Sequence, residues 1–131
     1  MAKTITALKI EPGKHPYAVR LYTGGQYLKY AVSVGARYIC EVDTIELENG
    51  VGILFNAEGA LLGLQANRKI GKRIIVGVFY VVGIDETGKL TSLSHNDIDK
   101  YWSDLCEPEQ YSDDEVQSNY ADSFFDFIDN L

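Results

Sequence analysis

The chain has 131 residues, a formal net charge of -7 and two cysteines. This length accommodates one domain with a substantial core. Two widely separated cysteines are too few for a disulfide framework or a cysteine-rich metal site, which favours a reducing compartment. No apolar stretch approaches the ~20 residues of a membrane-spanning helix, and the N-terminus lacks a signal-peptide run. We therefore expect a cytoplasmic protein with no membrane association.

The negative charge is unevenly distributed along the chain. Residues 1–106 contain all twelve basic and eleven of the nineteen acidic residues, so this part is near neutral at +1. Residues 107–131 contain eight acidic residues and no Lys or Arg, and carry -8. Phosphate binding needs clustered cations, so the acidic excess argues against free nucleic acid as the first partner.

The first third of the chain predicts a hairpin followed by a helix. Residues 4–10 are β-branched and apolar and end at Pro12-Gly13, which indicates a strand, and residues 17–22 are its expected hairpin partner. Apolar residues then recur at helical spacing over 27–34, with Gly35 as a C-cap.

The next segment predicts a second hairpin. Residues 37–42 have strand character, and Asn49-Gly50 stands between two apolar runs, as in a type I′ turn. A two-residue loop of this kind pairs Glu48 with Val51 and places Ile45 opposite Leu54.

The remaining elements of the domain are less uniform. Residues 60–73 mix small, apolar and basic side chains, which indicates an ordered loop with at most one helical turn. Residues 74–84 are almost continuously apolar and predict one central strand buried on both faces, with bends or bulges at its glycines. A short strand over 90–93 precedes Ser94, the expected N-cap of a helix that ends before Pro108.

These elements predict an α+β fold. We expect a mostly antiparallel sheet of about five to six strands with two to three short helices, formed by a single domain over residues 1–106. Residues 107–131 form an acidic aromatic tail, in which a polar hinge over 107–118 precedes an amphipathic helix.

The tail is the strongest candidate for a binding element. Its apolar residues follow a helical spacing of i, i+4, i+8 and i+11, and acidic residues occupy the opposite face. A helix of this length is marginal in isolation and needs a surface to pack against. The candidate partner-binding residues are Tyr120, Phe124, Phe125, Phe127, Ile128 and Leu131, with Asp122, Asp126 and Asp129.

One cluster of cations stands out in the domain, and it consists of Arg68, Lys69, Lys72 and Arg73. Four positive charges in six residues can hold phosphates, with a nearby tyrosine for stacking. The simpler interpretation is a solvated loop. A third is that this patch receives the acidic tail, either of its own chain or of a second copy in a homodimer.

No arrangement of residues indicates catalysis. His95 and Asp99 have the i, i+4 spacing of two metal ligands, but no further ligand is visible, and a solvated first helical turn explains them better. A pair formed by His15 with Cys40 or Cys106 stays open from sequence, although a cysteine on an apolar helix face is usually inert packing. We expect no catalytic residue, metal or cofactor.

The order of several short motifs resembles a known family. These motifs are Glu11-Pro12-Gly13-Lys14, Asn56-Ala57-Glu58-Gly59, Leu62-Gly63-Leu64, Asn67-Arg68, Ile75-Val76-Gly77, Leu90-Thr91-Ser92-Leu93-Ser94 and Lys100-Tyr101. Over about residues 4–105 the chain resembles small uncharacterised proteins of phages, plasmids and conjugative elements of Gram-positive bacteria, catalogued as a domain of unknown function. The resemblance implies an accessory protein inside a bacterial host, often encoded beside counter-defence genes, and it transfers no catalytic residue.

Two functions follow from these observations. The first is a non-enzymatic protein whose tail helix docks into a hydrophobic groove with a basic rim on a host protein, and can thereby inhibit it; nucleic-acid mimicry by the carboxylates is a variant. The alternative is a structural tail that packs on its own core, with nucleic-acid or small-ligand binding through Arg68–Arg73.

Overall fold

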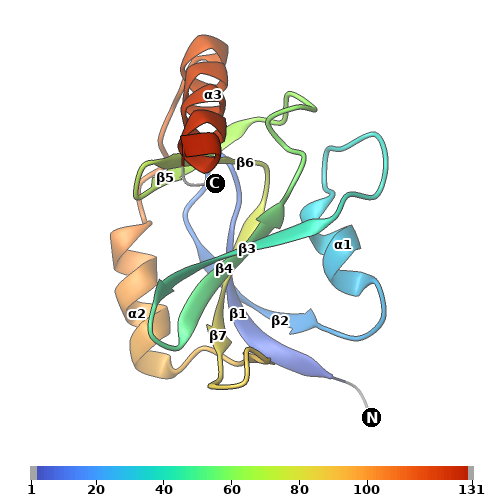
Figure 1. The fold of residues 1–131 in the computed structure, drawn as a ribbon. Helices are drawn as coiled ribbons and strands as arrows, with labels where there is room; N and C mark the ends of the chain where they lie inside the picture. The colour runs from blue at the N-terminus through green and yellow to red at the C-terminus, as the bar shows by residue number, and fades with distance from the viewer. Residues whose placement is uncertain (1–2, 130–131) are drawn as a thin grey trace.

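The computed structural model describes residues 3–129, with side chains described as far as Asp122. Its main feature is an antiparallel sheet with strand order β2-β1-β7-β4-β3 (Figure 1). The short strand β8 pairs with β7. The strands are β1 (Thr4–Ile10), β2 (Tyr17–Tyr22), β3 (Val42–Glu48), β4 (Val51–Asn56), β7 (Phe79–Ile84) and β8 (Leu90–Thr91). The expected α+β fold with a mostly antiparallel sheet is confirmed.

A second, two-stranded sheet consists of β5 (Ala66–Ile70) and β6 (Arg73–Val76). The helices are α1 (Tyr27–Val32), α2 (His95–Asp104) and α3 (Asp113–Asp129). No helix in the described part of the chain combines the length and apolar character that crossing a bilayer requires.

The main sheet is buried on both faces because the side chains of β7 alternate between two cores. Phe79 and Val81 join the core beneath α2, whereas Tyr80 and Val82 join the core beneath α1. Ile75 of β6 also belongs to the α2 core, so the small sheet is joined to that side of the domain. The prediction of a central, doubly buried strand is therefore confirmed for residues 79–84.

The long strand expected over residues 74–84 is wrong in one respect, because it is two strands in different sheets. The chain turns at Gly77, whose φ of 75° lies in the left-handed region that favours glycine. The amide of Asn67 donates to the carbonyls of Ile10 and Gly77, at 3.0 and 2.8 Å, and so fixes the break. A continuous apolar run conceals such a break, since both halves are buried.

Two further predictions fail locally. Residues 37–41 are not a strand, because the N–H of Cys40 donates to the hydroxyl of Ser33 at 2.8 Å and folds this segment into a loop. In the β3–β4 hairpin, Glu48 pairs with Val51 as expected, but a bulge between Glu46 and Glu48 shifts the register. Ile45 consequently pairs with Ile53 instead of Leu54.

The segment expected to be a loop over residues 60–73 forms β5 and the turn of the β5–β6 hairpin, after one helical turn over residues 57–63.

The hydroxyl of Ser94 accepts a hydrogen bond from the N–H of Asp97 at 3.1 Å, which confirms the predicted N-cap of α2. On this helix Tyr101 is buried, whereas the indole N–H of Trp102 donates to the carbonyl of Pro16 at its edge.

Arg68 is fully buried and links three distant segments of the chain. Its guanidinium donates to the carbonyl of Leu105 at 2.9 and 3.1 Å, to that of Lys14 at 2.6 Å and to that of Glu11 at 3.3 Å. Burial lowers the pKa of this guanidinium, and the carboxylate of Glu109 opposes the shift. The charge is satisfied mainly by carbonyl dipoles, two of them at the C-terminal end of α2, where a cation is favoured.

We expect Arg68→Lys to destabilise the protein by about 3 kcal/mol, because a lysine cannot reach all of these carbonyls and leaves buried acceptors unpaired. Urea unfolding measures the difference, with Lys69→Arg on the exposed neighbour as the matched control. Equal unfolding midpoints for Arg68→Lys and the wild type would contradict this role.

Candidate functional site

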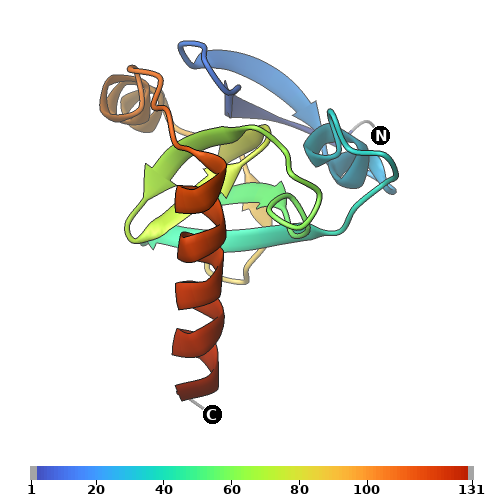
Figure 2. The ribbon, with the colours of Figure 1, turned by 90° about the horizontal axis from the view of Figure 1, so that it is seen from above.

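The β5–β6 hairpin and the chain after Cys106 lie side by side, so the structure brings together the two regions that the sequence marked as candidate sites. We call residues 107–112 the strap. It leads from the end of α2 to α3, which begins against the small sheet and runs past the β3 side of the body (Figure 2). Contacts between these segments form the candidate site.

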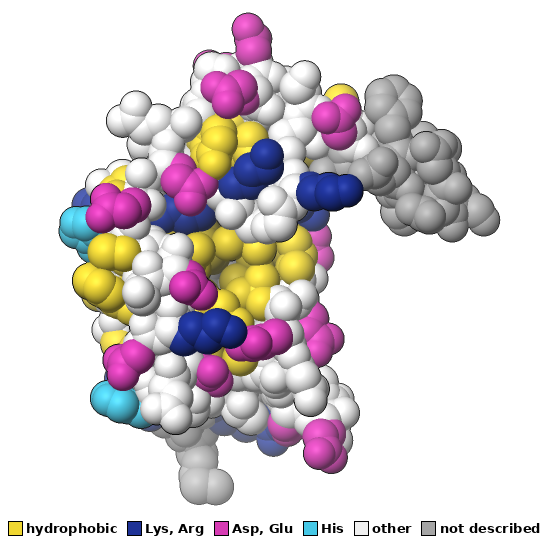
Figure 3. Space-filling view, turned by 90° about the vertical axis from the view of Figure 1, so that its left-hand side faces the viewer, with side chains coloured by type: hydrophobic (Ala, Val, Ile, Leu, Met, Phe, Trp, Pro, Cys, Tyr) yellow, Lys and Arg dark blue, Asp and Glu magenta, His cyan; other side chains and the backbone are white. Residues whose placement is uncertain are grey.

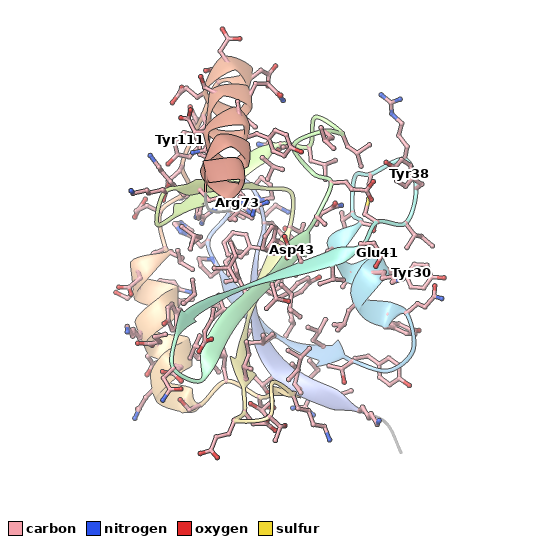
Figure 4. All side chains as sticks on the ribbon, viewed as in Figure 1. Tyr30, Tyr38, Glu41, Asp43, Arg73 and Tyr111 are labelled. Atoms are coloured by element: carbon pink, nitrogen blue, oxygen red, sulfur yellow. The ribbon has the colours of Figure 1, made fainter. Side chains whose placement is uncertain are left out.

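The four cations of the hairpin do not form one exposed patch. Arg68 is buried, which corrects its assignment to a solvated cluster. The guanidinium carbon of Arg73 lies 4.7 Å from the ring centroid of Phe55, and an Nη1 atom lies 4.0 Å from the carboxylate of Asp43 (Figure 4). The exposed members of the cluster are Lys69, on β5, and Lys72, in the hairpin turn.

The strap covers one edge of the hairpin. Lys69 and Ile74 face each other across the two strands. The N–H of Lys69 donates outward to the carboxylate of Glu109 at 2.9 Å, and the same carboxylate accepts the hydroxyl of Tyr111. Burial and this bond to Glu109 raise the pKa of Tyr111 to about 12. The strap is therefore attached through a hydrogen bond to the hairpin backbone, and no ion pair with Lys69 or Lys72 is among the contacts of these described residues.

The other edge of the hairpin is covered by α3. The side-chain amide of Asn119 accepts from the N–H of Ile74 at 2.8 Å and donates to the carbonyl of Lys72 at 2.7 Å. Each N–H of the facing pair is thus taken by a side chain from the region after Cys106. Gln117 adds a bond of 3.3 Å to the carbonyl of Ala60.

Among the described side chains of α3, Val116 provides a buried apolar contact. It is buried, with a relative exposure of 8%, and lies with Tyr120 over a hollow of about 20 Å³ whose floor includes Phe55 and Ile75. Burying one valine is worth about 1.5–3 kcal/mol and each hydrogen bond about 0.5–1.5 kcal/mol. Together the described contacts of Val116, Asn119 and Gln117 are worth about 3–8 kcal/mol, which overlaps only the lower part of the ~5–15 kcal/mol that stabilises a typical domain.

The start of α3 differs from the expected position. A hinge was predicted as far as Ser118, but the helix begins at Asp113 with a capping box. The hydroxyl of Ser112 accepts from the N–H of Glu115, and the carboxylate of Glu115 accepts from the N–H of Ser112, both at 3.1 Å. The Ser-x-x-Glu spacing was available in the sequence, and the surrounding polar residues concealed it.

Only two of the expected partner-binding residues, Tyr120 and Asp122, have side chains that the structure describes. Tyr120 is half-buried and Asp122 is exposed. The others, namely Phe124, Phe125, Asp126, Phe127, Ile128, Asp129 and Leu131, lie outside the residues whose side chains are described. The backbone of α3 continues to Asp129, and Figure 2 shows its second half extending beyond the sheets.

A second concave region lies between α2 and the hairpin turn. It has a volume of about 270 Å³ and apolar walls that include Leu47, Ile70 and Leu105. Figure 3 shows apolar side chains at the centre of this face, flanked by basic and acidic ones. The carboxylate of Glu48 accepts from the hydroxyl of Tyr101 at 2.6 Å and from Lys100 at 3.1 Å, and these bonds lower its pKa.

The candidate catalytic pairs have weak geometry. His95 and Asp99 are exposed and 3.9 Å apart, and the described residues contain no group of three metal-binding side chains. His15 Nδ1 lies 2.7 Å from the carbonyl oxygen of Cys106 and 3.6 Å from its sulfur. Because a carbonyl only accepts, Nδ1 carries the proton in this bond and is not placed to deprotonate the thiol.

We expect Ser112→Ala to accelerate hydrogen exchange of the Val116 amide about fivefold, because losing an N-cap costs about 1 kcal/mol. NMR-detected exchange measures this rate. Ser118→Ala is the matched control, since Ser118 is exposed in the same helix. Equal acceleration by both variants would show that the effect comes from serine removal in general.

We expect Tyr111 to titrate near pH 12, and Glu109→Gln to lower this pKa towards 10 without reaching it, because burial remains. The folded protein holds this proton more tightly than the unfolded chain, so the associated stability is present below pH 10 and is lost as pH rises from 10 to 12. NMR of the labelled tyrosine rings reads out the pKa. Glu107→Gln is the control, and an unchanged Tyr111 pKa in Glu109→Gln would refute the assigned cause.

Comparison with known proteins assigns the domain but no activity. No curated protein and no solved structure matches the chain. A family model described as a domain of unknown function, DUF3846, matches residues 5–106. This range agrees with the expected resemblance over about residues 4–105, and it ends where the strap begins. The match covers most of the sequence, and the chain therefore belongs to the DUF3846 family.

Proposed function

We propose that this protein is a non-enzymatic accessory protein of a phage or mobile element, and that it acts in the cytoplasm of a bacterial host by binding a host protein. The outer half of α3 is the docking element. Its partner presents a hydrophobic groove with a basic rim, and occupation of that groove inhibits the partner in the manner of a counter-defence protein.

The observation that carries this proposal is the division of α3 into two halves. The inner half is fixed to the small sheet through Val116 and Asn119, while the ribbon of the outer half extends beyond the body (Figure 2). A fixed inner half supports a helix in the outer half, which reduces the entropy lost on binding. Aromatic residues at helical spacing are the usual anchors of helix-in-groove recognition.

The charge of α3 indicates the chemistry of the partner. The first turn contains Asp113, Asp114 and Glu115, which the positive end of the helix dipole stabilises. The last turn has no basic residue and includes Asp129, an arrangement that the negative end of the dipole disfavours. Lysine or arginine side chains on the rim of a partner groove would remove this penalty.

The contacts of the inner half also support part of the alternative, a tail that packs on its own domain. Residues 109–119 cover the hairpin edges, so truncation at Cys106 would expose backbone groups as well as remove the docking element. A chain ending at Asp122 separates the two roles, because it keeps every described contact of the strap and α3. Nucleic-acid binding through the hairpin has less support, since Arg68 is buried and Arg73 is engaged by Phe55 and Asp43.

The test is affinity capture from a Gram-positive host lysate, followed by mass spectrometry and by affinity measurement with the captured protein. The double variant Phe124→Gln/Ile128→Gln removes two anchors while keeping good helix formers, and Ala121→Gln is the exposed control. We expect the double variant and the chain ending at Asp122 to bind at least about thirtyfold more weakly, as expected for a lost hot spot.

Equal retention of the same host protein by the intact chain and the chain ending at Asp122 would overturn docking through the outer half. Capture of nothing by the intact chain would count against a host-protein partner. Loss of binding in Ala121→Gln to the same extent as in the double variant would indicate a nonspecific effect on the helix.

A further inference from the structure

We propose that the outer edge of β6 is a second binding site, which accepts an extended acidic and apolar peptide segment when α3 moves away. The contact that points to this site is the side-chain amide of Asn119, which bonds to the backbone on both sides of Arg73, at Lys72 of the turn and at Ile74 of β6. This inference does not depend on the proposed docking of the outer half of α3.

The amide of Asn119 reproduces the hydrogen bonds of a neighbouring strand. It accepts the N–H of Ile74 at 2.8 Å and donates to the carbonyl of Lys72 at 2.7 Å. In a parallel pair of strands, one residue makes these two bonds with the residues that flank its neighbour. The carboxamide has the same donor and acceptor as a peptide group, so a strand running parallel to β6 can replace it bond for bond.

Within the described residues 3–129, the small sheet has no third strand beside β6. It contains two strands, β5 and β6, and a two-stranded sheet gains stability when a third strand adds to it. At the edge of β5, the carboxylate of Glu109 accepts the N–H of Lys69. At the edge of β6, the N–H of Ile74 is bonded to a side chain of the helix α3 and not to the backbone of a third strand. Once α3 has moved away, such an edge is a template for pairing with another chain.

Few buried apolar contacts hold the described part of α3 over this edge. Among the α3 side chains that the structure describes, Val116 is the buried hydrophobic one, and the exposed face of the first turns is acidic. Elements with few buried apolar contacts open at a lower free energy than the core of a protein. Opening of α3 exposes the small hollow over Phe55 and Ile75, which an apolar side chain of the peptide then fills in place of Val116.

The charges around the edge define the rest of the peptide. Lys72 is exposed at the hairpin turn, Lys69 is exposed on β5, and Arg73 lies at the rim of the hollow. Of these three cations, Arg73 is the one that lies near the carboxylate of Asp43. Carboxylates that alternate with apolar residues on the peptide complement this distribution, because alternate side chains of a strand point to opposite faces.

The test uses the full chain and a nine-residue peptide that alternates valine with glutamate and has blocked ends. Asn119→Asp keeps an acceptor for Ile74 but removes the donor and places a charge against the carbonyl of Lys72. Ser118→Asp adds the same charge on the exposed face and is the matched control. Val116→Ala loosens α3 without adding charge, and covers the case in which the new carboxylate repels the peptide.

We expect Asn119→Asp or Val116→Ala to bind the peptide up to about tenfold more tightly than the wild type or Ser118→Asp, because losing one such contact shifts the opening of α3 by about that factor. Hydrogen exchange of the Ile74 amide should be faster in both loosened variants and slow again when the peptide binds. A peptide that is N-methylated at alternate residues, on the edge that would face β6, should not bind, because it has no N–H to donate to the carbonyl of Lys72.

Three results would overturn the proposal. Faster exchange at Ile74 without a gain in peptide affinity would mean that the free edge does not accept a strand. Unchanged exchange in both loosened variants would mean that α3 does not control access to the edge. Equal affinity for the peptide with lysine in place of glutamate would refute the acidic character of the partner.

Discussion

The burial of Arg68 is the constraint on which the other arrangements depend. A guanidinium without solvent contact must find acceptors for its donors, and here they are carbonyls from the turn after β1 and from the end of α2. These contacts hold the carbonyls of Leu105 and Cys106, directly after the last residue of α2, and so hold the point from which the strap starts. The strap in turn reaches Lys69, the residue next to Arg68, through Glu109. One buried cation therefore determines the path by which the chain leaves the family domain and returns to cover the β5–β6 hairpin.

The features that sequence analysis predicted correctly are those with local causes. Asn49-Gly50 specifies a tight turn by its own backbone preferences, and Ser94 caps a helix through a bond to a residue three positions away. The failures have distant causes. Arg68 looks like a solvated cation until the carbonyls of residues 11–14 and 105–106 are placed around it, and no spacing in the sequence encodes that meeting. The break at Gly77 is similar, because it is fixed by Asn67 from another strand. For the candidate site, the capping box at Ser112 could have been predicted, whereas the pairing of Asn119 with β6 could not.

The region after Cys106 differs in character from a flexible acidic tail. From Glu109 to Asn119 its polar side chains bond to the backbone of the hairpin, and these bonds require no charge on the partner residue. The acidic residues of the first turn are consequently free to face solvent and to stabilise the start of α3. Sequence analysis offered pairing of the acidic tail with the basic cluster as one way for the tail to contact the domain, and packing of its apolar face on the core as another. In the structure, the acidic residues stabilise the first turn of α3. Hydrogen bonds from the side chains of Glu109 and Asn119 attach the strap and the helix to the β5–β6 hairpin.

This division bears on how a short helix can act as a binding element. An isolated helix of about twelve residues is marginal in water, because the conformational entropy lost in forming the first turn exceeds the free energy gained from its hydrogen bonds. In α3 the nucleus is supplied by the capping box and by the contacts of Val116 and Asn119, so residues beyond Asp122 extend a helix that already exists. The same contacts keep the β6 edge occupied, and whatever loosens them weakens the outer helix as it uncovers the edge. Binding at one location is therefore expected to oppose binding at the other, since a docking partner needs α3 ordered and a strand partner needs it displaced.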